Sequence, residues 1–521
     1  MSTVLLINPS YHTTYGGTKG TMTNPIYPTL GLTTIAAEAL RRGHRVHVVD
    51  QSYHPYDWRK IQAEILRIKP DIVGITASTP LMNQARDISV LCKDISAEIL
   101  VCAGGAHISA LPVESLRESC FDVVFVGESE TAFGEICDGH APKDVLGVYF
   151  RDGDEIRFSG ERLLLSNLDD LPMPAWHLYN PEEYRHRGSR ILVRNPPATI
   201  TEFSRGCIYK CDFCASKMTM GLGYRKKSAA RCAAEVKEMH RQGWREFMLA
   251  DDIFTSDNHW AGDVADAIAG LNNGMTWSCN NGIRVESAND ALFRRLRASG
   301  CYRVSFGFES GNDEVLKAFG KGGRASLEKG RVAAKMARAA GIDTNGFFLL
   351  GLSADNEVSM RDTIGFARTL ELDVMLFGIA IAFPGTKMFN AYYDAELIRS
   401  FDWDLYHARS SEPLFAHPTL SHDAIQRQMS IAYREAILTN PAFLKRRLKR
   451  SIRTGELFSD MRYAIKMLAL PAAQRDATSA YYAQARWPRW NPATHPIKAT
   501  TYQSKVAKGG QHHPTADPAA G

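Results

Sequence analysis

The first 145 residues alternate short apolar runs with segments of helical periodicity. The apolar runs predict strands at Val4–Ile7, Arg45–Val49, Ile72–Thr76, Ile99–Cys102 and Val123–Val126. The periodic segments predict helices at Leu32–Arg42, Trp58–Ile68 and Met82–Leu91. Strands that alternate with helices are typical of a parallel, doubly wound sheet, so we expect a Rossmann-like α/β domain over residues 1–145.

Small and polar residues follow these predicted strands. They are Asn8-Pro9, Asp50, Thr76 to Thr79, Gly104-Gly105 and Gly127-Glu128. In a doubly wound sheet, ligands bind beyond the carboxyl ends of the strands, so these residues suit a cofactor crevice. They are equally ordinary turn residues, and the pattern alone leaves both interpretations open.

The pattern changes after residue 145. Residues 146–195 predict a short β segment and a linker, with a turn at Asp152-Gly153-Asp154. Over residues 196–386, six strand-like runs alternate with helices and predict a partial (β/α)6 barrel. These runs are Thr199–Phe203, Glu246–Leu249, Thr276–Asn280, Arg303–Phe306, Thr344–Leu350 and Val374–Ala382. Residues 387–485 predict a helical C-terminal region, and the composition of residues 486–521 predicts a disordered tail.

Composition narrows the class of protein. The chain has 521 residues, too many for one core, and a net charge of +5 that gives no reason to expect a nucleic-acid partner. No signal peptide and no membrane span is predicted, so a cytoplasmic protein is expected. Ten cysteines are too few for a disulfide scaffold in a chain of this length, so a cysteine cluster would indicate metal binding or catalysis.

Three cysteines form such a cluster. Cys207, Cys211 and Cys214 come just after the first strand of the predicted barrel, where active-site loops lie. Three thiolates can bind three irons of a cubane and leave the fourth iron open as a chelation site. Structural zinc is the alternative, but it usually needs a fourth Cys or His at matching spacing, and no second pair follows.

The spacing C-x3-C-x2-C, with Phe213 before the last cysteine, resembles the signature of the radical S-adenosylmethionine (SAM) superfamily. Four later motifs fall in the order of that family: Asp251-Asp252-Ile253-Phe254, Gly307 to Gly311, Gly346 to Gly351 and Phe383-Pro384-Gly385-Thr386. The resemblance implies that Cys207, Cys211 and Cys214 hold a [4Fe-4S] cluster whose open iron binds SAM. An electron then cleaves SAM to a 5′-deoxyadenosyl radical, which abstracts hydrogen from an unactivated carbon.

The resemblance also assigns SAM contacts. Phe213 would pack near the adenine, Glu309 would accept hydrogen bonds from the ribose hydroxyls, and the segment from Gly346 to Gly351 would bring backbone close to the adenine. Asp252 takes the place of a Gly-Gly-Glu segment that binds the SAM amino group in many relatives. Glu309 could instead be a strand-end salt-bridge partner. An electron donor such as flavodoxin or ferredoxin is implied as a partner.

The first domain resembles the cobalamin-binding domain that precedes many radical SAM domains. The matching stretches include Pro28 to Leu32, Gly43 to Asp50, Pro70 to Ile75 and Gly127 to Glu130. The candidate contacts with cobalamin are Asn8, Thr76, Ser78, Gly104, Gly105 and Glu128. The Asp-x-His-x-x-Gly signature of a cobalt-ligating His is absent, because Asp50 and His54 stand at the wrong spacing. A degenerate domain without cofactor is the alternative, and His54 and His107 are interpreted as hydrogen-bonded residues rather than metal ligands.

The C-terminal region contains a basic amphipathic segment. Residues 443–453 combine six cations with Leu444, Leu448 and Ile452 at helical spacing. Such a helix can contact an anionic membrane surface, so peripheral membrane contact is one hypothesis, and a solvated outer face is the other. Trp403, Tyr406 and Phe415 either line a substrate pocket or pack against the barrel.

Together these features predict a cobalamin-dependent radical SAM enzyme. The preferred reaction is methylation of an unactivated carbon of a small-molecule or lipid-like substrate, with methylcobalamin as the methyl donor. The alternatives are an oxidative cyclase or rearrangement enzyme of the same superfamily and, more distantly, a non-enzymatic iron–sulfur or corrinoid sensor.

Overall fold

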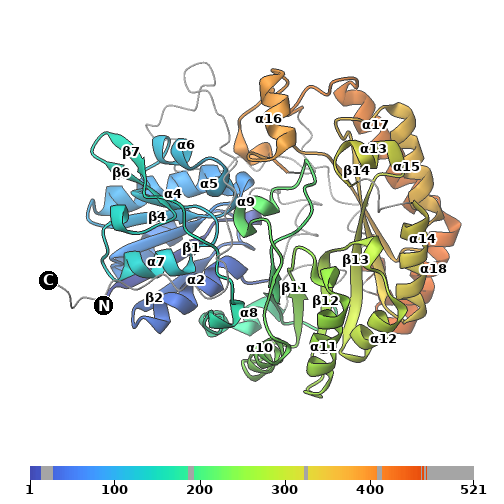
Figure 1. The fold of residues 1–521 in the computed structure, drawn as a ribbon, viewed down its shortest axis with the longest axis horizontal. Coiled ribbons are helices and arrows are strands. Elements are labelled where there is room, and N and C mark those ends of the chain that lie inside the picture. Colours follow the sequence, from blue (N-terminus) through green and yellow to red (C-terminus); the bar gives the residue numbers. More distant parts are fainter. Residues whose placement is uncertain are drawn as a thin grey trace.

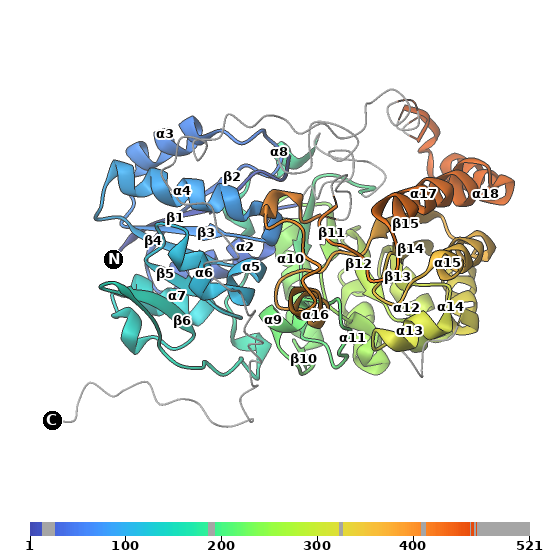
Figure 2. The same cartoon turned by 90° about the horizontal axis from the view of Figure 1, so that it is seen from above.

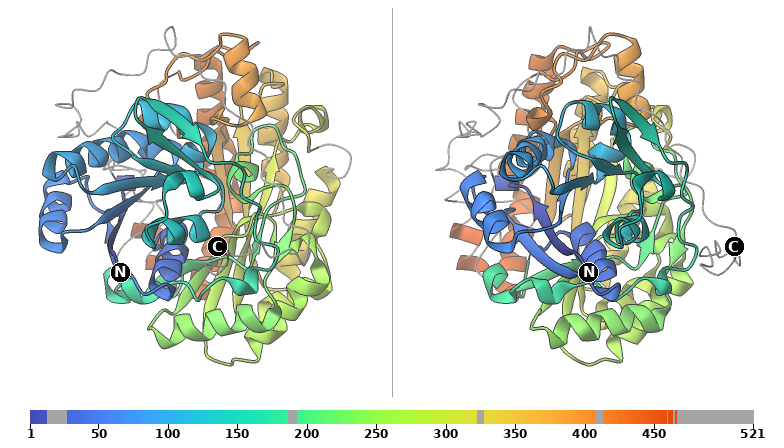
Figure 3. Two further views of the ribbon diagram at one scale, coloured as in Figure 1. Left: turned by 60° about the vertical axis from the view of Figure 1, so that its left-hand side comes forward. Right: turned by 90° about the vertical axis from the view of Figure 1, so that its left-hand side faces the viewer.

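The computed structural model describes residues 1–12, 27–185, 193–321, 327–407 and 413–465, except 459, 463 and 464. The predicted tail at 486–521 and the end of the predicted helical region lie outside these residues. Two α/β units pack side by side, and the C-terminal region covers part of both (Figures 1 and 3). No helix in the described ranges is long and apolar enough to cross a membrane.

The N-terminal unit is built on a seven-stranded sheet in the order β2-β1-β3-β4-β5-β6-β7. The first five strands are parallel, as predicted. Every residue of β1, which pairs with β2 and β3, is buried, because helices cover both faces of the sheet. The strands are β1 (Thr3–Asn8), β2 (Arg45–Asp50), β3 (Ile72–Thr76), β4 (Leu100–Gly104), β5 (Val123–Phe125), β6 (Val148–Asp152) and β7 (Glu155–Phe158), and the helices are α2 (Leu30–Arg41), α3 (Trp58–Ile68), α4 (Met82–Ile95), α5 (Ala106–Ala110), α6 (Pro112–Arg117) and α7 (Glu130–Cys137).

Strands β6 and β7 correct the expected boundary at residue 145. They form the short β segment predicted after residue 145, but as a hairpin that pairs antiparallel with β5 and so belongs to the first sheet. Strand β7 is an edge strand whose side chains are largely exposed, so it lacks the apolar run by which the inner strands were recognised. The stacked rings of Tyr149 and Phe158 hold the two strands together on one face.

The second unit is the partial barrel that the sequence predicts. Its six strands are all parallel and follow the order β15-β14-β13-β12-β11-β8, so each pairs with its neighbours along the chain. The helices lie on the outside of the strands (Figure 1). The strands are β8 (Ala198–Thr201), β11 (Glu246–Leu249), β12 (Thr276–Ile283), β13 (Cys301–Glu309), β14 (Asp343–Leu350) and β15 (Val374–Ile379), and the helices are α10 (Ala229–Arg241), α11 (Asn258–Ala269), α12 (Asp290–Ala298), α13 (Asp313–Ala318), α14 (Leu327–Ala339) and α15 (Glu357–Thr369).

The C-terminal region is only partly helical. Its helices are α16 (Lys387–Asp394), α17 (His422–Ala432) and α18 (Pro441–Thr454), with a π-helical turn at Tyr433–Leu438. Between α16 and α17, Ile398 pairs with Phe415 in an isolated β-bridge. This irregular segment packs onto the N-terminal unit, since the buried Trp403 contacts His107 with ring centroids 4.8 Å apart.

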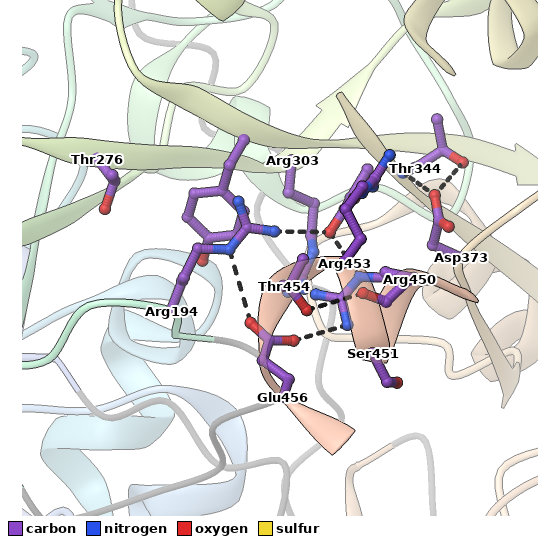
Figure 4. Close-up of polar contacts among 12 residues, drawn as sticks. Arg194, Thr276, Arg303, Thr344, Asp373, Arg450, Ser451, Arg453, Thr454 and Glu456 are labelled. Atoms are coloured by element: carbon purple, nitrogen blue, oxygen red, sulfur yellow. Dashed lines mark hydrogen bonds and ion pairs between the residues drawn. The ribbon is translucent and has the colours of Figure 1, made fainter. Parts of the chain in front are cut away.

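Helix α18 docks at the amino-terminal end of the barrel strands. Arg450 is almost fully buried, and its Nε donates to Asp343, the first residue of β14, at 2.6 Å (Figure 4). Arg194 and Arg453 approach the same carboxylate at 3.0 Å and 3.2 Å. Burial alone would raise the pKa of Asp343, but the surrounding arginines hold it below its ordinary value. The basic helix is therefore held on the barrel by several of its cations, of which Arg450 is the most buried.

Candidate active site between the two units

The three motif cysteines lie in one loop at the boundary between the units. Strands β9 (Ser204–Arg205) and β10 (Arg225–Lys226) pair antiparallel and close the base of residues 206–224, which we call the cysteine loop. Gly206 has a φ of 84°, and a Cβ atom there would lie 2.1 Å from the carbonyl oxygen of Gly223, so only glycine fits this closure. Helix α9 (Ser216–Met220) follows the cysteines and lies between the two sheets (Figures 1 and 2).

The thiols of Cys207, Cys211 and Cys214 are half-buried and form no disulfide. Burial raises the pKa of Cys207 and raises the pKa of Cys214 to about 11, so a bound metal is needed to keep these groups as thiolates. Three cysteines in one loop can each bind one iron of a cubane, so the loop is suited to a cluster.

Two consecutive aspartates follow β11, and their surroundings differ. Asp251 is buried and already satisfied, because it accepts from the backbone N–H of Phe203 at 2.7 Å and from the hydroxyl of Ser204. Asp252 has a buried carboxylate oxygen without a hydrogen-bond partner among the described residues. Its charge raises the pKa values of both Cys207 and Cys214, which places it beside the cysteines. Asp252 is thus suited to bind a cationic group next to the cluster.

Glu309 ends β13 in a left-handed conformation with a φ of 63°. Its carboxylate pairs with Lys321 at 3.1 Å, and Lys321 also donates to the carbonyl of Gly307. The strand-end salt bridge that the sequence allowed is therefore formed, and a ribose contact stays a prediction that would require Glu309 to share or exchange this partner.

The two glycines expected near the adenine differ in their surroundings. A Cβ atom on Gly346 would lie 2.5 Å from Leu372 and would press on the stacked rings of Phe308 and Phe348, so packing beneath the helices already accounts for this glycine. Gly351 has a φ of 76° and lines a small cavity at the barrel mouth. The other lining residues of this cavity include Tyr392, Phe415, His417 and His422.

Phe213 packs beside the cysteines. Its ring meets that of Phe319 edge to face, with centroids 5.4 Å apart, and the backbone N–H of Asp212 donates to the Phe319 carbonyl at 3.1 Å. These contacts hold the last part of the cysteine motif against α13. The expected contact of Phe213 with adenine stays a prediction.

A cavity of about 250 Å³ lies between the N-terminal sheet and the cysteine loop. Four of the six residues predicted to contact cobalamin line it: Thr76, Gly104, Gly105 and Glu128. The second unit contributes residues to the same cavity, which are Glu202, Arg205, Thr219 and Met220. A whole cobalamin is larger than this cavity, so the lining fits a part of that molecule, such as its nucleotide tail or one edge of the corrin.

The remaining two predicted contacts lie elsewhere. Asn8 is fully buried, and its amide donates to Asp50 at 2.9 Å and to Ser52 at 2.6 Å, so it organises the loop after β2. Ser78 precedes a 3₁₀ helix at Thr79–Leu81 and is not part of the cavity lining. Gly105, by contrast, is required by backbone geometry, since a Cβ atom at its φ of 116° would lie 2.6 Å from the carbonyl oxygen of Ala77.

Several residues of the site gave no sequence signal of their own. Arg205 and Arg225 flank the cysteine loop, and Glu130 reaches Arg205 from the N-terminal unit. For the two arginines, proximity to the cysteine motif is the only clue in the sequence, whereas Glu130 belongs to the stretch from Gly127 to Glu130 that resembles the cobalamin-binding domain. His107 is hydrogen-bonded to Thr79 at 3.3 Å, as predicted, but it is buried in α5 rather than placed on a surface or loop, and this burial lowers its pKa to about 3.

Comparisons with known proteins agree with this architecture. The family model described as B12 binding domain matches residues 21–137, and the Radical SAM superfamily model matches residues 201–367. An uncharacterized methyltransferase of Pyrococcus horikoshii is 29% identical over 412 residues, which cover 78% of this chain and 87% of that protein. The cytidylyl-2-hydroxyethylphosphonate methyltransferase of Streptomyces wedmorensis is 30% identical over 401 residues, which cover 67% of this chain and 72% of that protein.

Solved structures show the same fold. The radical SAM methyltransferase TsrM of Kitasatospora setae, with cobalamin and a [4Fe-4S] cluster bound, matches with a TM-score of 0.66 at 17% identity, over 83% of this chain and 91% of that chain. The cobalamin-dependent radical SAM enzyme OxsB, with aqua-cobalamin and SAM bound, matches with a TM-score of 0.59 at 17% identity, over 83% of this chain and 61% of that chain.

Proposed function

Since this chain belongs to the family of cobalamin-dependent radical SAM methyltransferases, we propose that it methylates an unactivated carbon of a small-molecule substrate. Its cofactors are those of the family: a [4Fe-4S] cluster, SAM and cobalamin. When bound, these groups supply the electron and the radical that activate the substrate carbon and the methyl group that it receives. The observation that carries the proposal is the cavity whose lining comes from both units.

Different residues of the chain would bind the cluster, SAM and cobalamin. Cys207, Cys211 and Cys214 hold the cluster in the cysteine loop. Asp252 would accept a hydrogen bond from the amino group of SAM with the carboxylate oxygen that has no partner among the described residues. Phe213, Glu309 and the backbone from Gly346 to Gly351 bind the adenosine part. On the other side, Thr76, Gly104, Gly105 and Glu128 receive cobalamin.

Methyl transfer and oxidative cyclisation are the two reactions to separate. An anaerobic magnesium-protoporphyrin IX monomethyl ester cyclase of Rubrivivax gelatinosus is 24% identical over 438 residues. The relative that methylates a cytidylylated phosphonate is more similar, at 30%, which favours methyl transfer to a small molecule. A reductant such as flavodoxin or ferredoxin would deliver the electron.

The products decide between these reactions. The full chain is reconstituted anaerobically with iron, sulfide and cobalamin and given SAM and a strong reductant, and 5′-deoxyadenosine and S-adenosylhomocysteine are quantified. We expect both products from the wild type and no 5′-deoxyadenosine from Cys207→Ala. Cys120→Ser, which alters a partly exposed thiol outside the cysteine loop, should behave as the wild type. Formation of 5′-deoxyadenosine without S-adenosylhomocysteine would indicate the cyclase reaction, and binding of SAM without cleavage would indicate a sensor.

We also propose that α18 contacts an anionic membrane surface from the cytoplasmic side, which would suit a lipid-like substrate. Its apolar stripe points outward, with Leu444, Leu448 and Ile452 exposed to 47%, 52% and 62%. The adjacent stripe carries the exposed cations Lys445, Lys449 and Arg453. An exposed apolar stripe beside cations fits the boundary between lipid headgroups and acyl chains.

Vesicle sedimentation tests this contact. The full chain should sediment with vesicles that contain phosphatidylserine and not with vesicles of phosphatidylcholine alone. The triple variant Leu444→Gln, Leu448→Gln, Ile452→Gln should lose binding, while Val358→Gln, at an apolar side chain exposed elsewhere, should retain it. Equal sedimentation of the triple variant and the wild type would contradict the proposal, and so would the absence of wild-type binding.

A further inference from the structure

We infer that Glu128 anchors the cysteine loop to the cofactor cavity, so that cobalamin binding and cluster assembly favour each other. Glu128 lies in the loop after β5 of the N-terminal unit, and its side chain is only 6% exposed. It was expected to contact cobalamin, but its strongest contacts are with the second unit. The inference rests on the cofactors of the proposed function and adds a positioning role that those cofactors do not require.

Both ends of the cysteine loop meet this one carboxylate. Arg205 and Arg225 are direct partners across the β9–β10 pair, on either side of residues 206–224. Arg225 donates to Oε2 of Glu128 at 2.9 Å, and its other terminal nitrogen lies 2.7 Å from Oε1. Nη1 of Arg205 lies 3.3 Å from the same Oε1. The base of the cysteine loop is therefore tied to the N-terminal unit at the point where the loop begins and ends.

Further buried contacts fix the direction of the two arginines. Arg205 also donates to Glu130 at 2.6 Å and to Glu202 at 2.7 Å, and its side chain is 3% exposed. Arg225 donates to the backbone carbonyls of Leu165 and Met220 at 2.9 Å and 2.8 Å. Buried ion pairs of this kind add little net stability, because both charges lose their hydration, but they hold a geometry once it is formed.

Glu128 and the charged residues around it also line the cavity between the units. Glu128, Glu130, Glu202 and Arg205 all line the space between the units, and Arg205 stands two residues before Cys207. A molecule that fills the cavity thus packs against the group that orients the cysteine loop. Because coupling between two binding sites is reciprocal, a formed cluster should raise the affinity for cobalamin and bound cobalamin should favour the cluster-competent loop.

A binding cycle tests the anchor without measuring turnover. The dissociation constant of hydroxocobalamin is measured anaerobically by absorbance titration of the full chain, before and after reconstitution of the cluster. In the wild type, we expect the cluster to tighten cobalamin binding about 5-fold or more. We call the ratio of the dissociation constants without and with the cluster the coupling factor. In Glu128→Gln, this coupling factor should fall to about 1. Glu135→Gln, which alters an ion pair with Arg162 within the N-terminal unit, should keep the wild-type factor.

The results of this experiment distinguish failure of the inference about Glu128 from failure of the proposed function. An equal factor in Glu128→Gln and the wild type, or no coupling in the wild type, would overturn the inference while leaving the proposed function intact. A wild type that binds no cobalamin in either state would contradict the proposed function itself. If Glu128→Gln fails to fold because it leaves a buried arginine unpaired, Glu128→Gln combined with Arg225→Gln removes both charges, and its factor should also be about 1.

Discussion

At the scale of single residues, neighbouring side chains of the same type have different roles. Both oxygens of Asp251 accept hydrogen bonds, one from the backbone N–H of Phe203 and one from the hydroxyl of Ser204. Asp252, in contrast, has one buried oxygen without a hydrogen-bond partner among the described residues. The sequence selected Asp252 for the SAM amino group only by analogy of position, and this role stays a prediction. The distinction comes from the loop geometry after β11, which no short motif reports.

Replacement of Asp252 by Asn should weaken SAM binding. A charge-assisted hydrogen bond contributes about 1.5–3 kcal/mol, so the dissociation constant should rise roughly 10-fold or more. Equilibrium dialysis of labelled SAM with the reconstituted enzyme measures this, and the absorbance of the cluster should not change. Asp266→Asn, at an exposed carboxylate of α11, is the matched control. An unchanged dissociation constant for Asp252→Asn would remove this residue from the SAM site.

The burial of another aspartate, Asp87, leads us to predict that the free energy of unfolding depends on pH. Asp87 in α4 is fully buried, accepts a hydrogen bond from Tyr56, and has another oxygen without a partner among the described residues. Burial raises its pKa to about 7, above its value of about 3.9 in an unfolded chain. The folded state therefore keeps a proton that the unfolded state releases, and stability is lost as the pH rises from about 4 to about 7.

The substitution Asp87→Asn should abolish this loss. Relative to the wild type, the variant should gain about 1–4 kcal/mol in free energy of unfolding on going from about pH 5 to about pH 8. Chemical denaturation at the two pH values measures the difference. Asp94→Asn, at an exposed position of the same helix, should show no such pH-dependent gain. A constant difference between Asp87→Asn and the wild type at both pH values would contradict the prediction.

At the scale of elements, the sequence predicted the strands of the two large sheets but not that the short β segment after residue 145 joins the first sheet. Runs such as Val4–Ile7 and Ile72–Thr76 are buried on both faces, so they appear in the sequence as continuous apolar stretches between turns. Strands β6 and β7 correspond to the predicted short β segment with its turn at 152–154, but β7 is exposed and polar, so no apolar pattern showed that this segment extends the first sheet. The cysteine motif was predictable because its spacing is local, whereas Gly346 is explained by packing against residues from other elements.

Helix α18 should contribute to stability through Arg450. The substitution Arg450→Met breaks a buried ion pair with Asp343, and such losses cost about 3–5 kcal/mol, reduced here because Arg194 and Arg453 remain near the carboxylate. We expect a clear decrease in the denaturant midpoint of the barrel. Arg434→Met, which removes an exposed cation near Glu435, should change the midpoint little. Equal midpoints for the two variants would show that α18 is not locked through Arg450.

At the scale of the whole molecule, the arrangement of the two units carries the function. The sequence predicted each unit and its cofactor separately, but the ion pairs between Glu128 and the arginines of β9 and β10 join segments that lie far apart along the chain. Such contacts leave no periodic pattern, so only the structure shows that four of the residues predicted to contact cobalamin share one cavity with residues of the cysteine loop.

The most direct test of this account is the magnetic interaction between the two cofactors. Reduced, reconstituted protein that holds cob(II)alamin is studied by electron paramagnetic resonance, and the spin relaxation of cob(II)alamin is compared between the wild type and Cys207→Ala. If both cofactors lie on the shared cavity, the reduced cluster should accelerate this relaxation in the wild type and not in the variant. The same relaxation in both proteins, with cobalamin and cluster each bound to the wild type, would contradict the shared site.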